Sequence, residues 1–350
     1  MTRYKKYIET NVYDEAKKRL HHIYDTHDSV VVAFSGGKDS LAVLHLCKEV
    51  AEERGLPKVH VVFRDEELIN KVVIDFVRKK MLEPWVDLKW WAVPLESHKY
   101  ILGHMTDFIQ WQPGKRWVRE KPEWALTEKD LGIPVDSALS QYSADEVAIT
   151  GFAGKVCIIT GIRSAESLMR FRSSVNKLNE NYINKSGTPR ATLGRPIFDW
   201  EENDVFKYFY DNKIPYCPIY DWQTWANKSL RVASAINSEA AREFDKLKAV
   251  DPDLYEAIID IHPDMIMQGR YFKELDRNAV VQKYATSWST ILAWIMENIS
   301  GDKQRNKALV EYKSVRTRAA ILPKQYPLDY VLKSIMNEGG KRRILPLKVE

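Results

Sequence analysis

One short run in the chain of 350 residues has the residue types that bind phosphate, and it reads Ser35-Gly36-Gly37-Lys38-Asp39-Ser40. The two glycines allow a backbone to approach an anion closely, Lys38 supplies a positive charge, and the two serine hydroxyls can donate to phosphate oxygens. Asp39 can hold magnesium or cap the helix that follows. The alternative interpretation is a plain turn that joins a strand to a helix.

The neighbouring elements predict where this run lies. Residues 30–34 are apolar and mostly β-branched, as in a strand buried on both faces of a parallel sheet, and a helical pattern begins at Leu41. A strand, a glycine-containing loop and a helix in this order turn backbone N–H groups toward an anion. The spacing fits neither the Walker loop nor the dinucleotide motif Gly-x-Gly-x-x-Gly. The sequence therefore indicates another family of nucleotide-binding proteins.

Strands alternate with helices through the first half of the chain. Residues 59–63, 88–93 and 156–161 have strand patterns, and residues 68–81 have a helical pattern. This alternation predicts an α/β fold with a doubly wound parallel sheet, whose ligands bind at the carboxyl ends of the strands. The candidate ligand-binding residues at the ends of these strands are Arg64, Asp65, Gly161 and Arg163. Asp65 could bind magnesium or a ribose hydroxyl, or it could be a solvated loop acid.

We predict a nucleotide-binding domain over residues 1–225, with an insertion at about residues 100–148, and a mostly helical C-terminal region over residues 226–350. The helical region is expected to form a wall of the substrate site or a contact within a homo-oligomer. The insertion is rich in tryptophan and arginine, which stack on bases and grip phosphates, or else pin a long loop to its domain. We favour pinning. The candidate residues for a substrate such as nucleic acid are Arg116, Arg119, Arg170 and Arg172.

Composition narrows the functional classes. The formal charge of +5 suits phosphate-bearing ligands but does not by itself indicate nucleic-acid binding. The three cysteines are widely separated, so we expect neither a disulfide framework nor an iron–sulfur cluster. No apolar run has the length of a signal peptide's core or a membrane span. We therefore expect a cytoplasmic protein without a membrane partner.

Three segments resemble known proteins. Residues 35–40 resemble the PP-loop of the ATP pyrophosphatases, within the adenine-nucleotide alpha-hydrolase-like superfamily. Residues 161–167 with Arg170 resemble the Gly-Ile-Arg-x-x-Glu-Ser segment of phosphoadenosine phosphosulfate (PAPS) reductases, and residues 195–221 resemble a further block of that group. The insertion is similar to that of the IbrA-like, prophage-associated branch, and DndC-like proteins are further relatives.

The resemblance implies that the protein binds ATP or PAPS and uses Mg²⁺. It implies cleavage of the α–β phosphate bond of ATP, transfer of the adenylyl group to an acceptor and release of pyrophosphate. Lys38 and Arg163 would be the catalytic residues that stabilise charge on the phosphates. The acceptor would belong to sulfur transfer or nucleic-acid modification, and a ParB-like protein would be the partner.

The sequence departs from the reductases at one decisive point. PAPS reductases use a nucleophilic cysteine near the C-terminus, whereas no cysteine follows Cys217, which stands where the group usually has asparagine. We expect Cys217 to be a packing residue. The alternatives to an adenylylating enzyme are an FMN adenylyltransferase-like enzyme, a PAPS-binding reductase-like protein, and a nucleotide-sensing regulator without turnover.

Overall fold

The computed structural model describes residues 9–134, 137–175, 181–272, 277–299, 301–338 and 343–347. The chain forms two compact units. The first comprises Met1–Leu95 and Gln110–Ala233, and the second comprises Glu96–Ile109 and Ser234–Glu350.

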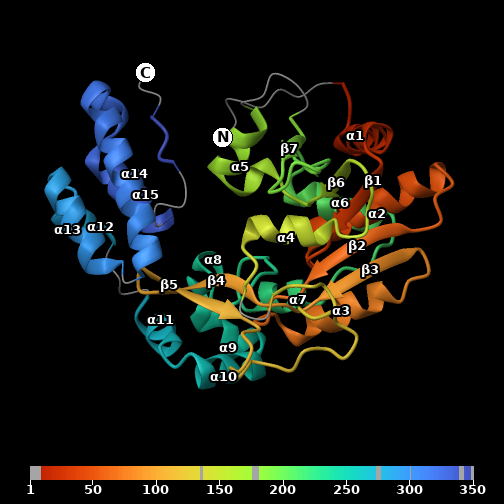
Figure 1. Cartoon of the computed structure of the whole chain (residues 1–350), viewed down its shortest axis with the longest axis horizontal. Helices are drawn as coiled ribbons and strands as arrows, with labels where there is room; N and C mark the ends of the chain where they lie inside the picture. The colour runs from red at the N-terminus through yellow and green to blue at the C-terminus, as the bar shows by residue number, and fades with distance from the viewer. Residues whose placement is uncertain are drawn as a thin grey trace. The chain divides into compact units, whose positions relative to one another are not determined.

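The first unit contains a six-stranded sheet in the order β3-β2-β1-β6-β8-β7 (Figure 1). Its strands are β1 (Ser29–Ala33), β2 (Val59–Arg64), β3 (Val86–Trp91), β6 (Val156–Ile159), β7 (Ile183–Lys185) and β8 (Ala191–Gly194). All neighbours pair in parallel except β7, which pairs antiparallel with β8 at the edge. The chain proceeds outward from β1 to β3 and then returns to the other side of β1 as β6. Ligands of such sheets bind at this reversal of direction, beyond the carboxyl ends of the strands.

Helices cover both faces of this sheet. They are α1 (Val12–Thr26), α2 (Lys38–Glu53), α3 (Lys71–Met81), α4 (Gln141–Ala148), α5 (Leu168–Val175), α6 (Glu202–Asp211) and α7 (Ile219–Trp225). On one face, Val31 and Ile158 pack into a cluster with Ala144 of α4. On the other, a Cβ added to Gly194 would lie 3.1 Å from the side chain of Ile23 in α1. The predicted doubly wound α/β fold is confirmed, with an added antiparallel edge strand.

The start of α2 shapes the region after β1. Lys38 is the first helical residue, and the N-cap, Gly37, has no side chain to accept from the N–H groups of the first turn. By contrast, the N-cap of α1 is Asn11, whose side chain accepts from the Asp14 N–H. Because the first N–H groups of a helix have no partner within it, those of α2 must bind other groups.

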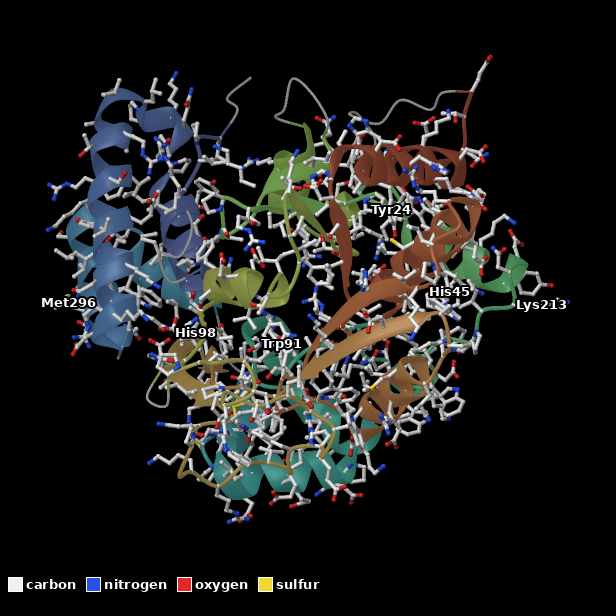
Figure 2. The ribbon with its side chains drawn as sticks, turned by 45° about the vertical axis from the view of Figure 1, so that its right-hand side comes forward. Tyr24, His45, Trp91, His98, Lys213 and Met296 are labelled. Carbon is white, nitrogen blue, oxygen red and sulfur yellow. The ribbon has the colours of Figure 1, made fainter. Side chains whose placement is uncertain are left out.

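The second unit is mostly helical. It contains the hairpin of β4 (Leu95–Ile101, whose first residue belongs to the first unit) and β5 (His104–Gln110, whose last residue does likewise). His98 of this hairpin is labelled in Figure 2. The α-helices of the second unit are α8 (Ser238–Ala241), α9 (Leu247–Val250), α10 (Pro252–Ile261), α11 (Met265–Tyr271), α12 (Arg277–Tyr284), α13 (Trp288–Asn298), α14 (Asp302–Ile321) and α15 (Leu328–Glu338). Within the described ranges, no helix has the length and apolar character needed to cross a membrane.

The predicted insertion is divided between the two units, and the predicted helical region does not begin with a helix at residue 226. Residues 100–109 of the insertion belong to the second unit, in which the Tyr100 N–H donates to the Ile236 carbonyl at 3.0 Å. Residues 226–237 form no helix. Asn227 has a φ of 49°, which interrupts helical geometry just after α7.

Candidate functional site

A cavity of about 1180 Å³ opens at the carboxyl ends of β1 and β6, which are neighbours at the reversal of the sheet. Residues that follow β1 line one part of it and residues that follow β6 line another. Its charged lining residues are Lys38, Asp39, Arg64, Arg163, Glu166, Arg170, Glu201, Glu202, Lys228 and Arg231. Six of these ten are cations and four are acids, so the lining carries a formal charge of +2. A cavity of this size and sign suits a large anion.

The run of residues 35–40 is braced by its own hydroxyls. The Ser35 N–H donates to Ser40 Oγ at 3.2 Å, and Ser40 Oγ in turn donates to the Gly37 carbonyl at 3.0 Å. The Gly37 N–H donates to Ser35 Oγ at 3.3 Å. These hydroxyls thus fix the shape of the loop, and because both serines line the cavity, their donation to a ligand stays a prediction.

Gly36 is needed for the shape of the loop. Its φ is +75°, a conformation that residues with a Cβ adopt at a cost. An added Cβ would lie 2.7 Å from Val73 and 2.8 Å from Val77, both in α3. Gly36 was predicted to bind the ligand, but it packs against α3, outside the cavity lining.

Tyr220 of α7 supports the loop of residues 35–40 through a hydrogen bond. Its hydroxyl accepts from the Lys38 N–H at 2.6 Å, at the uncapped start of α2. The tyrosine is buried, and this burial raises the pKa of its hydroxyl, so the group stays protonated. Tyr220 thus satisfies one N–H of the first turn without placing a negative charge there.

Two cations meet on one carboxylate inside the cavity. The Asp39 oxygens pair with Arg163 Nε at 2.6 Å and with Lys38 Nζ at 3.1 Å. Lys38 Nζ also lies 3.3 Å from a Glu202 oxygen and donates to the Leu230 carbonyl at 3.2 Å. Lys38 and Arg163 are 3% and 4% exposed, so both charges are held in a poorly solvated place. An anion bound there would interact strongly with them.

The segment after β6 holds Arg163 against the loop. Gly161 lies so close to α2 that an added Cβ would meet the Asp39 and Ser40 backbone at 2.5 and 2.6 Å. The Ser164 N–H donates to the Phe198 carbonyl at 2.7 Å and fixes the turn beyond Arg163. This close backbone approach explains the need for glycine at position 161.

Among the predicted substrate arginines, only Arg170 lines the cavity, where it pairs with Glu166. Arg64 also lines the cavity and pairs with Glu66 at 2.9 Å. Arg116 and Arg172 are not among the lining residues.

Asp65 lies outside the cavity lining, so its predicted contact with magnesium or ribose has no support in the structure. Its carboxylate is fully buried, accepts from Trp90 Nε1 at 2.9 Å and pairs with Arg119. Burial raises the pKa of this carboxyl, and the Arg119 charge opposes that rise. Arg119 also lies over the Trp111 ring, 4.9 Å from its centroid, and Trp111 is fully buried. These contacts support pinning of the segment after β5 rather than base stacking.

The acids of the cavity do not form a prepared magnesium site. Both oxygens of Asp39 already pair with cations, and Glu202 pairs with Lys38. Mg²⁺ needs several oxygen ligands in near-octahedral geometry, so an ion bound by Asp39 would have to break these pairs. Within the described part of the chain, no three His, Cys, Asp or Glu side chains gather in a metal-binding group.

Comparison with known proteins agrees with this geometry. Residues 29–225 match the family model of the phosphoadenosine phosphosulfate reductase domain. The chain belongs to this family. The matched range contains residues 35–40, called the phosphate loop below, the segment around Arg163 and all of α7. It ends before residues 228–233 of the cavity lining.

Individual relatives are distant. Uncharacterized protein YbdN of Escherichia coli (strain K12) is 26% identical over 273 residues, covering 74% of this chain and 67% of that protein. Adenosine 5′-phosphosulfate reductase of Staphylococcus epidermidis (strain ATCC 35984) is 23% identical, covering 61% of this chain and 75% of that one. The Candida glabrata FMN adenylyltransferase bound to FMN and AMPCPP is 15% identical and covers 63% of this chain and 61% of that chain, with a TM-score of 0.42. Because this score is below 0.5, the fold assignment rests on the strand order itself.

The cysteines of this member of the family are poorly suited to nucleophilic chemistry. All three are buried. Burial raises the pKa of the Cys217 thiol to about 11 and that of Cys157 to about 11. Burial also raises the pKa of Cys47. Since the thiolate is the reactive form, none has the lowered pKa of a catalytic cysteine.

Sequence reasoning missed several residues of the site. Tyr220 lies in the block of residues 195–221 that resembles the reductases, but its contact with Lys38 was not foreseen. Glu202, which lies in the same block, and Leu230, which lies outside it, contact the Lys38 ammonium and were not predicted. Lys228 and Arg231 fall in a range predicted to be helical, but the chain leaves helical geometry at Asn227, and both residues line the cavity.

Proposed function

We propose that this protein is an enzyme that binds an adenine nucleotide by its phosphates and cleaves the α–β phosphate bond of ATP to adenylylate an acceptor. The observation that carries the proposal is the convergence of Lys38 and Arg163 on Asp39, between β1 and β6. An α/β sheet binds nucleotides at this reversal point, and two poorly solvated cations are suited to a phosphate chain.

In the proposed reaction, an oxygen of the acceptor attacks the α-phosphorus of ATP. The bond between that phosphorus and the α–β bridging oxygen breaks, and pyrophosphate leaves with the electron pair. The acceptor's proton passes to solvent. Lys38 and Arg163 would leave Asp39 for the phosphates and stabilise the negative charge that develops on the bridging oxygen. Asp39 and Glu202 keep these cations in place until the anion binds.

Reduction of PAPS is a weaker hypothesis for this chain. It needs a nucleophilic thiolate, and Cys217, the last cysteine in the sequence, is buried with its pKa raised to about 11. Adenylyl transfer needs no thiol. Because the cysteines are poorly reactive, adenylyl transfer is favoured over PAPS reduction.

The identity of the acceptor belongs to the same proposal. If the expected resemblance to IbrA-like and DndC-like proteins holds, the acceptor would belong to sulfur transfer or nucleic-acid modification, and a ParB-like protein would be the partner. The contacts of Arg119 with Asp65 and Trp111 leave Arg170 as the predicted substrate arginine with a place in the cavity. We therefore expect the acceptor to enter beside Arg170.

The test uses ATP labelled with ³²P at the α-phosphate. The protein is incubated with it and a magnesium salt, alone and with nucleic acid, FMN or PAPS, and AMP, pyrophosphate and adenylylated products are followed. The Lys38→Ala variant removes the loop ammonium. The Lys48→Ala variant is the matched control, because Lys48 lies on the same helix but pairs with Glu52, away from the cavity lining.

We expect wild type and Lys48→Ala to release pyrophosphate with the adenylyl product, and Lys38→Ala to lose this release about 100-fold or more. Formation of FAD with FMN would assign the FMN adenylyltransferase-like alternative. Binding of ATP without cleavage under every condition would assign a regulator instead. Failure of the wild type to bind ATP would overturn the proposal.

A further inference from the structure

Residues 228–233 lie directly on the phosphate loop although the family match ends before them. The Leu230 carbonyl accepts from Lys38 Nζ at 3.2 Å. A Cβ added to Gly37 would lie 3.5 Å from Val232 Cβ, so the segment packs against the loop at this glycine. Lys228 and Arg231 of the same segment line the cavity. The segment thus forms one wall of the site.

This wall is held by one buried side chain. Gln223 of α7 is 2% exposed, and its amide makes two hydrogen bonds with a single residue of the wall. Gln223 Nε2 donates to the Arg231 carbonyl at 2.7 Å, and the Arg231 N–H donates to Gln223 Oε1 at 3.0 Å. The paired bonds fix both the position and the direction of the wall's backbone, as a neighbouring strand would.

The same helix also holds the phosphate loop. Tyr220 and Gln223 are three residues apart on α7 and so lie on one face of it. Tyr220 accepts from the Lys38 N–H, while Gln223 holds Arg231. One rigid element therefore sets the distance between the loop and the wall.

We propose that Gln223 is a positioning residue for the phosphate site: it holds residues 228–233 across the loop, and this wall then binds the phosphate chain of the ligand together with the loop. The proposal rests on the proposed function in one respect, that the loop binds phosphates. Leu230 orients the Lys38 ammonium, and Lys228 and Arg231 bring two further cations to the ligand.

The chain offers a matched control for removal of this amide. Gln268 in the second unit is fully buried, donates to the Ala241 carbonyl at 2.7 Å and accepts from the Leu102 N–H at 2.7 Å. Gln223→Met and Gln268→Met thus each remove two backbone hydrogen bonds of a buried glutamine. Comparable losses of stability are expected, but only Gln223→Met should change the phosphate site.

The first measurement is the affinity of the full chain for pyrophosphate by titration calorimetry, with thermal unfolding of each variant. We expect Gln223→Met to weaken binding about tenfold, as removal of hydrogen bonds that position charged groups does, and Gln268→Met to leave it unchanged. Equal affinity of folded Gln223→Met and wild type would overturn the inference. If Lys38→Ala alone lost binding, the assignment of the phosphate site to the loop would stand, and only the positioning role of Gln223 would be wrong. If wild type binds neither pyrophosphate nor ATP, both proposals fail.

The Gln223→Glu variant provides a second measurement that a merely structural role would not affect. When protonated, the introduced carboxyl has one donor and one acceptor, as the amide has, and it can make both bonds to Arg231. When ionised it has no donor for the Arg231 carbonyl. We expect its pyrophosphate affinity, relative to wild type at the same pH, to be restored as the pH falls. A ratio independent of pH would contradict the proposed positioning.

Discussion

The first unit contains two arginine–aspartate pairs with different surroundings. Arg163 and Asp39 meet inside the cavity between β1 and β6, where Lys38 joins them. Arg119 and Asp65 meet beyond β2, and they are enclosed by tryptophan. Both aspartates follow parallel strands, where this kind of fold binds its ligands, and both were predicted to bind magnesium.

The difference lies in the partners and in the exposure of the two carboxylates. The side chain of Asp39 is 17% exposed and that of Asp65 is fully buried, whereas the arginines that pair with them are 5% and 21% exposed. Asp65 also accepts from the fixed indole of Trp90 and lies outside the lining of the cavity. Asp39 holds two cations at the edge of a large cavity, and a phosphate can replace it as their partner. The pair at Asp39 is thus suited to function and the pair at Asp65 to stability.

The largest expected effect comes from removing the two arginines in turn. Arg163→Gln should lower the rate of pyrophosphate release from ATP about 100-fold or more, because it removes charge stabilisation in a poorly solvated site. Arg119→Gln should leave this rate within about threefold of wild type and lower the unfolding temperature instead. Initial rates and thermal scans of both variants check the contrast. The reversed pattern would show that the functional role belongs to the pair of Arg119 and Asp65.

The second effect concerns stability. Asp65→Ala leaves Arg119 and the Trp90 N–H without their buried partner, and we expect a loss of about 3–5 kcal/mol in the free energy of unfolding. Asp39→Ala should cost less, because its partners Lys38 and Arg163 each retain another oxygen contact. Urea unfolding of the two variants measures the difference. Equal losses would mean that the open and the enclosed pair are energetically alike.

Local patterns in the sequence were sufficient for the strands β1, β2, β3 and β6 and for the phosphate loop, whereas β7 and β8 were not predicted. The apolar strand before Ser35 and the glycines after it predict a loop at a strand end, and the structure has it there. They could not reveal whether a charge faces a cavity or another side chain. Asp65 and Arg119 are far apart in sequence, and their pairing depends on how the segment after β5 folds back.

The wall of residues 228–233 shows a second limit of sequence analysis. Helical periodicity predicts a helix through this region, whereas its backbone is held by Gln223, which lies eight residues before Arg231, and by Lys38, which lies 192 residues before Leu230. Gln223 itself has no pattern that marks it, because a buried amide that holds a backbone resembles any other glutamine in a helix. Tertiary hydrogen bonds here override local propensity.

The third effect compares a glycine of the phosphate loop with one of the segment after β5. Gly36 and Gly114 have φ values of +75° and +72°, but only Gly36 has close neighbours. Gly114→Ala should cost about 1 kcal/mol for backbone strain alone, and Gly36→Ala about 2–4 kcal/mol because it also collides with Val73 and Val77. Urea unfolding gives both values, and ATP affinity should fall only in Gly36→Ala. Equal costs would mean that α3 moves aside without penalty.

The smallest effect is expected at Cys217, which separates adenylyl transfer from thiol chemistry at the same site. Burial raises the pKa of this thiol to about 11, so about one molecule in a thousand carries the thiolate at pH 8. Alkylation of the folded protein by iodoacetamide should therefore be slow at pH 8 and accelerate as the pH rises toward 11, while protein unfolded in urea reacts rapidly. Cys217→Ala should release pyrophosphate at the wild-type rate. Fast alkylation at pH 8 together with loss of turnover in Cys217→Ala would favour thiol chemistry over adenylyl transfer.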